Sequence, residues 1–179
     1  MKPTFASRLT VGALLVTLGL PGAAAAQYQL PTVISSVKAD SLHQAAAALV
    51  TAHRYRDAAR LHRRSAELRP AEDPQGFQCL SEAAALVYAA GDRSAARGDM
   101  ARAAGHALAR GDLRGAALAY LDAAWIAQEQ NKPRQVWELG HRAEMLAQSP
   151  LLGVSDRAAI MQRIQRAPLA MRTAMQTEP

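Results

Sequence analysis

Apolar side chains recur through the middle of this chain at the spacing of an amphipathic helix, and short polar breaks interrupt that spacing. Between residues 40 and 50, apolar positions lie three, four, seven and eight residues apart, as on one helix face. The breaks Gly91-Asp92 and Gly111-Asp112 lie one helix length apart. Helices of this length joined by tight turns pack as antiparallel pairs. We therefore predict an all-α fold: a right-handed array of three antiparallel helical hairpins plus a C-terminal capping helix.

Helix-capping residues mark where the seven helices of this array begin. Asp, Asn and Ser side chains accept hydrogen bonds from the first free N–H groups of a helix. The second helix covers about 56–69 and stops at Pro70, and the third starts at Asp73-Pro74, a cap followed by proline. The seventh ends before Pro168. The predicted caps of the other helices are Asp40, Asp92, Asp112, Asn131 and Ser155.

Two segments that flank the array lack these signals. Residues 27–38 contain Pro31 and three consecutive β-branched residues, with no helical period, so we expect an extended leader. Residues 168–179 carry no stop signal, so we expect a flexible tail. The predicted array therefore spans residues 39–167.

The first 26 residues have the layout of a secretory signal peptide. Lys2 and Arg8 form a positive region, and Leu9 to Leu20 is an apolar run of 12 residues. Pro21-Gly22 breaks this run, and residues 23–26 are alanines, which signal peptidase accepts before its cut. An uncleaved anchor is the alternative, but spanning a bilayer takes about 20 apolar residues. We expect cleavage after Ala26 and a mature chain with no membrane span.

The composition agrees with an exported bacterial protein. Arginine supplies 18 of the 21 basic residues and alanine is abundant, which is typical of proteins from GC-rich genomes. Cys79 is the one cysteine, so no internal disulfide is possible. In an oxidising compartment it is either buried as a small apolar residue or bridges two chains. These features predict a periplasmic or secreted location.

The helix pairs resemble a known repeat. Helices one, three and five start about 34 to 38 residues apart, close to the period of a tetratricopeptide repeat. The first pair carries apolar or small residues at the packing positions and a terminal Pro70, and it departs from the motif at His62, where a large apolar residue is usual. The later pairs match less well. The resemblance implies a degenerate tetratricopeptide-like array with a concave binding face. The matching positions include Leu42, Ala45, Ala46, Leu49, Tyr55, Ala58, Ser65, Leu80, Ala84, Val87, Ala123, Ala124, Ala127 and Val136.

Residues that usually carry catalysis or hold metal ions show no familiar spacing. The five histidines stand at 43, 53, 62, 106 and 141, and no two are three or four residues apart. Gly153-Val154-Ser155 begins like a nucleophile elbow, but Arg157 replaces its second glycine. We predict no catalytic, cofactor-binding or metal site, and no enzyme activity, although distant histidines could still meet in the folded chain.

The tetratricopeptide resemblance implies that the first helix of each pair lines one groove. A Trp beside polar groups is a frequent anchor at peptide-binding surfaces. The alternative is that Trp125 and Trp137 simply pack between helices five and six, since Trp is usually mostly buried. The candidate groove residues are His43, Gln44, Glu82, Tyr88, Asp122, Trp125 and Gln128.

A second candidate surface is a cationic stripe on the second helix. Arg56, Arg60, Arg63 and Arg64 recur at helical spacing and could attract an anionic component of the cell envelope. The alternative is an ordinary solvated face with weak surface ion pairs. Nucleic acid is not an expected partner, because the protein is exported and only Tyr55 is an interleaved aromatic residue.

Three functions remain open from the sequence. The leading prediction is a non-enzymatic interaction module that binds a protein or peptide partner in its groove. A structural or assembly spacer is the second, and a binder of an anionic envelope component through the arginine stripe is the third.

Overall fold

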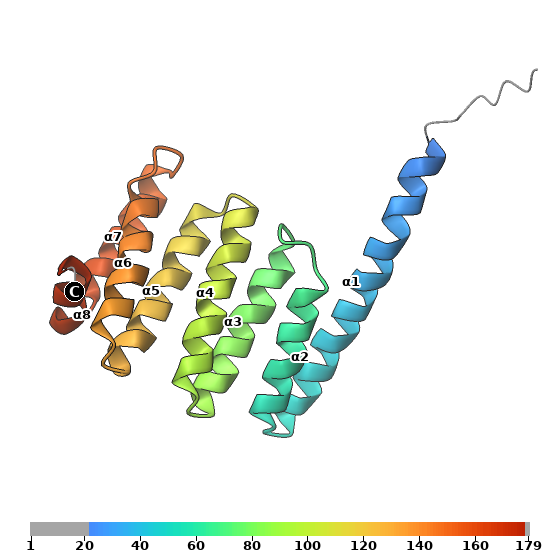
Figure 1. Cartoon of the computed structure of the whole chain (residues 1–179), viewed down its shortest axis with the longest axis horizontal. Helices are drawn as coiled ribbons and strands as arrows, with labels where there is room; N and C mark the ends of the chain where they lie inside the picture. Colours follow the sequence, from blue (N-terminus) through green and yellow to red (C-terminus); the bar gives the residue numbers. More distant parts are fainter. Residues whose placement is uncertain (1–21, 178–179) are drawn as a thin grey trace, which may run out of the picture.

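The computed structural model describes residues 22–177, and this part of the chain forms eight α-helices and no strand. Each of the first six helices packs chiefly on its neighbours in sequence, so together they form one row (Figure 1). This confirms the prediction of an all-α helical array. The helices are α1 (Gly22–Thr51), α2 (Tyr55–Glu67), α3 (Pro74–Ala89), α4 (Arg93–Ala109), α5 (Leu113–Glu129), α6 (Pro133–Ala147), α7 (Val154–Arg166) and α8 (Leu169–Gln176).

Four of the turns between neighbouring helices share one backbone design. Each places a left-handed residue two positions before the next helix, namely His53, Gly91, Gly111 and Asn131. Glycine adopts this conformation without strain, and Asn is the usual substitute at a helix end. Asn131 therefore ends α5 rather than capping α6, so the prediction of an Asn131 cap is wrong. The N-cap of α6 is Lys132.

Aspartate caps hold the start of three helices, as predicted. Asp73 accepts from the Gln75 N–H, Asp92 from the Ala95 N–H and Asp112 from the Gly115 N–H, at 2.8 to 3.0 Å. The predicted Ser155 cap is wrong, since Gly153 is the N-cap of α7 and makes no side-chain bond. Ser155 lies one residue inside the helix.

Alanine builds most of the interface between the helices. More than half of the buried apolar residues are alanines, among them Ala46, Ala84 and Ala124, each no more than 1% exposed. Small side chains let helix backbones approach closely, so the row is held by backbone proximity rather than by large side chains. Cys79 is also buried, at 1% exposure, which matches the buried alternative for the lone thiol.

The N-terminal segment is helical, which corrects two predictions. Residues 27–38 belong to α1 rather than to an extended leader, and Asp40 lies inside this helix rather than capping it. β-branched residues weaken a helix only slightly, so a helix already formed downstream extends through them. The first part of α1 runs beyond the end of α2 (Figure 1). Most of the predicted signal peptide lies outside the described residues, and residues 22–26 start α1.

The C-terminal segment is also ordered, contrary to the predicted flexible tail. Pro168 separates α7 from α8, and α8 packs on α6. Met171 and Met175 are buried, and Met175 covers Gly140 so closely that a Cβ there would lie 2.5 Å from its Cγ. Apolar burial on α6 thus supplies the stability that the short helix lacks by itself. Among the described helices, none is long and apolar enough to cross a bilayer.

Candidate functional site

A continuous groove follows one side of the helix row. Three adjoining pockets form it, lined mainly by the odd-numbered helices α1, α3, α5 and α7. Ala85 belongs to the first two pockets from the α1 end, and Asp122, Trp125 and Arg163 join the second to the third. The middle pocket has a volume of about 470 Å³. We call this surface the groove.

Trp125 stands in the groove with its polar edge already bonded. Its side chain is 44% exposed, so it is not enclosed between α5 and α6. The indole Nε1 donates to Glu129 at 3.3 Å, and the Tyr88 hydroxyl donates to the same carboxylate at 2.8 Å. Arg93 pairs with Glu129 at 3.2 Å. The hydrogen bond from Tyr88 is the main reason that the pKa of Glu129 lies below its ordinary value.

Asp122 and Arg163 form an ion pair across the groove, between α5 and α7. Burial raises the pKa of Asp122 above its ordinary value, and the opposing effect of Arg163 does not cancel this. The acids Glu129 and Asp122 are thus both bonded within the protein. What the groove offers a ligand beside them is mainly the apolar surface of Trp125 and Tyr88.

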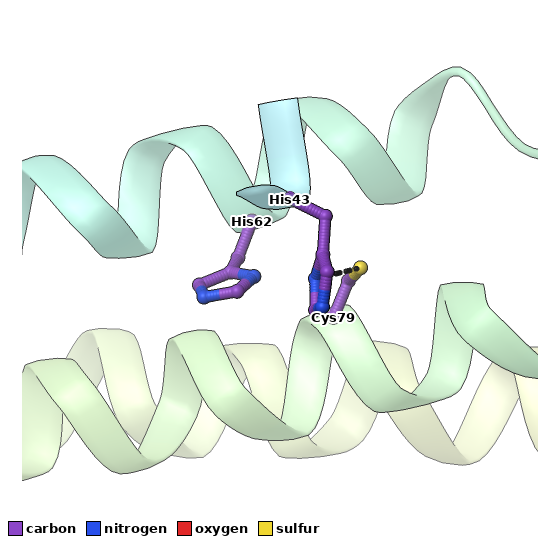
Figure 2. A group of neighbouring side chains, drawn as sticks. All are labelled: His43, His62 and Cys79. Atoms are coloured by element: carbon purple, nitrogen blue, oxygen red, sulfur yellow. Dashed lines mark hydrogen bonds between the residues drawn. The ribbon is translucent and has the colours of Figure 1, made fainter. Parts of the chain in front are cut away.

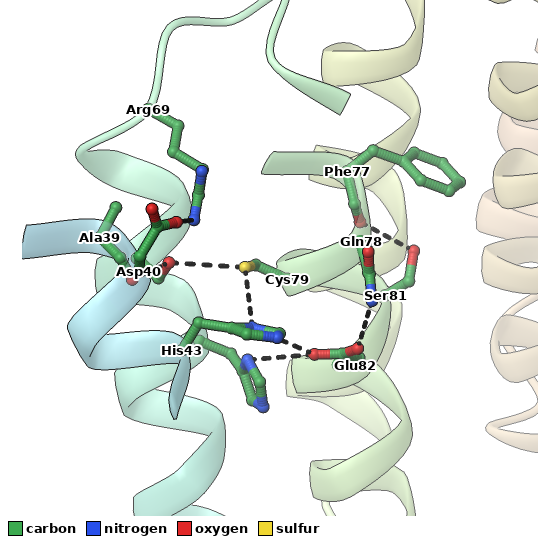
Figure 3. Close-up of polar contacts among 11 residues, drawn as sticks. Ala39, Asp40, His43, Arg69, Phe77, Gln78, Cys79, Ser81 and Glu82 are labelled. Atoms are coloured by element: carbon green, nitrogen blue, oxygen red, sulfur yellow. Dashed lines mark hydrogen bonds and ion pairs between the residues drawn. The ribbon is translucent and has the colours of Figure 1, made fainter. Parts of the chain in front are cut away.

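At the α1 end of the groove, four side chains from three helices converge. Figure 2 shows His43 of α1, His62 of α2 and Cys79 of α3, and one ligand atom of each lies within 4.8 Å of the others. The His43 Nδ1 lies 3.5 Å from the Cys79 Sγ and 3.5 Å from the Glu82 Oε2. Glu82 also lies 3.2 Å from the His62 Nδ1 (Figure 3). We call these four residues the His–Cys–Glu cluster.

His62 and Cys79 are buried in this cluster. His62 is only 4% exposed, and its Nδ1 lies near Glu82 without the geometry of a hydrogen bond. Burial lowers the pKa of His62, which favours the neutral imidazole. Burial also raises the pKa of the Cys79 thiol, more than the hydrogen bond with Ser65 and the nearby Arg69 lower it. The cluster therefore favours a neutral His62 imidazole beside a protonated Cys79 thiol.

The cluster does not have the geometry of a cysteine–histidine catalytic pair. A base that is oriented by a carboxylate uses its two ring nitrogens for the two partners. Here the same Nδ1 of His43 faces both Cys79 and Glu82. A nucleophilic cysteine also needs a lowered pKa and partial exposure, and Cys79 has neither. The arrangement suits holding a ligand rather than attacking a substrate.

The predicted groove residues divide into two groups. His43 and Glu82 line the pocket at the α1 end, and Tyr88, Asp122 and Trp125 line the middle one. Gln44 and Gln128 line none of the three pockets. Sequence reasoning placed the groove on the first helix of each pair, and the pockets follow these helices.

The arginine stripe does not form one free cationic surface. Arg63 donates to Asp99 from Nε at 2.9 and 3.0 Å, and Asp99 is 4% exposed. Arg64 pairs with Glu67 at 3.0 Å, and Arg60 pairs with Asp57. Of the four predicted residues, Arg56 alone has no acidic partner among the described residues. Pairing removes most of the charge that an anionic ligand would use.

The His–Cys–Glu cluster was not predicted from the sequence, because its residues lie on three different helices and share no short motif. His43, His62 and Cys79 are 19 and 17 residues apart, about half of the hairpin period. In an array of hairpins, residues half a period apart lie on neighbouring helices and can face each other. The departure of His62 from the apolar residue usual at its position was the visible signal.

A function for this chain has to be inferred from its fold and its groove, because comparisons with known proteins found no match: no model of a known protein family matches the chain, and neither does any curated protein or solved structure.

Proposed function

We propose that this chain is an exported, non-enzymatic interaction protein whose groove binds an extended segment of a partner protein. The observation that carries the proposal is the half-exposed ring of Trp125 between two adjoining pockets. We also propose a tetratricopeptide-like origin for the hairpins, and a periplasmic or secreted location after removal of the signal peptide.

The chemistry of the groove favours apolar side chains of an extended peptide. A large aromatic ring is usually mostly buried, so an exposed one beside a pocket is a plausible anchor point. Glu129 fixes both Trp125 and Tyr88 through hydrogen bonds, which lowers the entropy cost of binding. The groove also continues past several helices, and so can contact an extended segment at successive positions.

A phage-displayed library of unstructured peptides, selected on the immobilised mature chain, tests the proposal. Peptides that bind the natural chain should bind Trp125→Ala about 30-fold more weakly, which is the loss of a central aromatic anchor worth ~2 kcal/mol. Arg60→Ala and Arg64→Ala, outside the groove, are the matched controls and should leave binding unchanged. Binding should persist at high salt, because screening acts on charges and not on apolar contacts.

The opposite result would identify the third function that the sequence left open. If Trp125→Ala binds as well as the natural chain while Arg60→Ala or Arg64→Ala does not, the ligand is anionic and uses α2. Binding should then also weaken steeply as salt is added. The variant result or the salt dependence, each by itself, would overturn the groove proposal.

A spacer role has one observation in its favour. If the signal peptide is cut after Ala26, residues 27–51 of α1 remain and are about 38 Å long, whereas the 13 residues of α2 are about 20 Å long. Much of α1 therefore has no α2 alongside it. If no peptide is selected and the isolated chain captures partners only through residues 27–38, assembly through α1 becomes the better proposal.

A further inference from the structure

We propose that His43, His62, Cys79 and Glu82 form a binding site for a single transition-metal ion of the zinc class. The site lies at the α1 end of the groove, where three helices contribute its ligands. The inference is independent of peptide binding, so the two proposals can fail separately.

The residue types match the preferences of one class of ion. Two imidazoles, one thiolate and one carboxylate are borderline ligands that suit Zn²⁺ and exclude Mg²⁺ and Ca²⁺, which require oxygen ligands. Ligand atoms around a tetrahedral zinc ion lie about 3.3 to 3.7 Å apart. Three of the six separations among the cluster's ligand atoms are 3.2 to 3.5 Å, namely His43 from Cys79, His43 from Glu82 and Glu82 from His62. The ligand atoms of His43, His62 and Cys79 all lie within 4.8 Å of one another, and Glu82 stands beside this group.

The burial of the cluster gives a second, independent indication. A buried polar atom in a folded protein normally has a hydrogen-bond partner, and the Nδ1 of His62 has none among residues 22–177. A metal ion would supply the missing partner, since a neutral imidazole nitrogen is the form that binds metal. The tetratricopeptide resemblance implies an aromatic or large apolar residue at the position of His62, so packing alone does not require an imidazole.

The surroundings would support a bound ion. Ser65 lies 3.5 Å from the Cys79 Sγ and donates to the backbone carbonyl of Ala39 at 2.8 Å, so it is held in place beside the sulfur. Such outer contacts orient ligands in metal sites. His43 and Glu82 are partly exposed and line the pocket, which gives an ion a path from the groove. A bound ion would take the thiolate form of Cys79, releasing its proton to solvent.

The test uses the untagged chain, freed of metal with a chelator and titrated with Co²⁺ and Zn²⁺. We expect one equivalent of Co²⁺ to bind with visible ligand-field bands and thiolate-to-metal charge transfer. Zn²⁺ should displace it and raise the melting temperature, because an ion bound only to the folded state stabilises it. Mg²⁺ should do neither.

Variants separate the site from the fold. His62→Leu supplies the kind of large apolar residue that the tetratricopeptide resemblance implies there, so this variant should keep its helical circular dichroism but bind Co²⁺ at least about 100-fold more weakly. Cys79→Ser should lose the charge-transfer band, and Glu82→Gln should weaken binding less. His53→Ala, an exposed histidine outside the cluster, is the matched control and should bind as the natural chain does.

Three results would overturn the proposal. These are no stoichiometric binding of Co²⁺ or Zn²⁺, unchanged binding in both His62→Leu and Cys79→Ser, and a stronger effect of His53→Ala than of His62→Leu. Peptide binding by the groove in the absence of metal would leave this test unaffected.

Discussion

At the scale of single residues, two aspartates show that burial decides how much an ion pair contributes to stability. Asp99 is buried between α2 and α4, and its charge is held by Arg63, with Arg102 3.7 Å away. Asp57 is partly exposed and is flanked by Arg54 and Arg60. Removing a partner leaves an uncompensated buried charge only at Asp99, because water can solvate Asp57.

Arg63→Ala should therefore lower the free energy of unfolding by about 2 to 4 kcal/mol, since it leaves Asp99 without its main partner. Arg60→Ala, on the same helix and much more exposed, should cost no more than about 0.5 kcal/mol. Urea denaturation of both variants measures the difference. Equal losses would mean that the Arg63–Asp99 pair is not a buried contact between the helices.

Asp122 should make stability depend on pH in a defined direction. Burial raises its pKa in the folded state above the ordinary value, so the folded chain binds more protons than the unfolded chain between those two values. Its contribution to stability is therefore present at low pH and is lost as pH rises through the folded-state pKa. Asp122→Asn should unfold at a urea concentration at least as high as the natural chain at pH 7.

The advantage of Asp122→Asn should shrink as pH falls towards 3, where the natural carboxyl is protonated in both states. A variant that is clearly less stable at pH 7 would show that the ion pair with Arg163 outweighs burial. Denaturation curves at several pH values provide the check.

At the scale of helices, the row depends on small residues where neighbouring backbones approach. Ala46, Ala84 and Ala124 occupy the same position in the three hairpins, and each is no more than 1% exposed. The described buried apolar residues of α1, α2 and α4 are all alanines, whereas larger side chains are buried on α3 and on α5 to α8, among them Leu80, Tyr120, Ile160, Met171 and Met175. Packing between the described helices therefore shifts from small towards larger side chains along the row.

Each of the single variants Ala46→Leu, Ala84→Leu and Ala124→Leu should lower the free energy of unfolding by about 1 to 3 kcal/mol, because the added volume forces the helices apart. Ala45→Leu is the matched control on α1, since Ala45 is exposed and should tolerate the change. Thermal melts monitored by circular dichroism compare the four variants. Unchanged melting temperatures for all three buried positions would contradict the shared register.

At the scale of the whole molecule, each helix contacts its neighbours, and the groove crosses several of these contacts. A ligand in the groove would lie across α1, α3, α5 and α7, which already meet through side-chain contacts such as His43–Glu82, Tyr88–Glu129 and Asp122–Arg163. The His–Cys–Glu cluster also spans several helices, because its residues come from α1, α2 and α3.

The proposed export predicts that the signal peptide is removed from the protein. When the full sequence is expressed with a functional secretion pathway, we expect the exported form to begin at Gln27, because alanines at 24 and 26 suit the peptidase. Mass spectrometry of the exported protein measures its N-terminus, and Ala26→Arg should block the cut. A chain that stays full-length and within the cell would overturn the proposed location.

The sequence by itself determined part of the local structure of this protein. Helical spacing of apolar residues predicted the array, and Asp73, Asp92 and Asp112 capped helices where expected, because caps depend on contacts within a few residues. The other three predicted caps, Asp40, Asn131 and Ser155, were wrong. The segments that flank the array were predicted wrongly, because their structure does not depend on local contacts alone. Residues 27–38 and α8 carry weak local signals, and their helical state depends on continuation from α1 and on burial against α6.

Only the tertiary structure decided which distant side chains meet. From the sequence Arg63 belonged either to a candidate cationic stripe or to a solvated face with weak surface ion pairs, but it faces the buried Asp99, which lies 36 residues away. Trp125 could have been core or groove from its sequence position, and its surroundings leave it half exposed. His43, His62 and Cys79 share no helix and no short motif, so their meeting depends on how α1, α2 and α3 pack. Contacts between helices follow from the packing of whole surfaces, which no short stretch of sequence specifies.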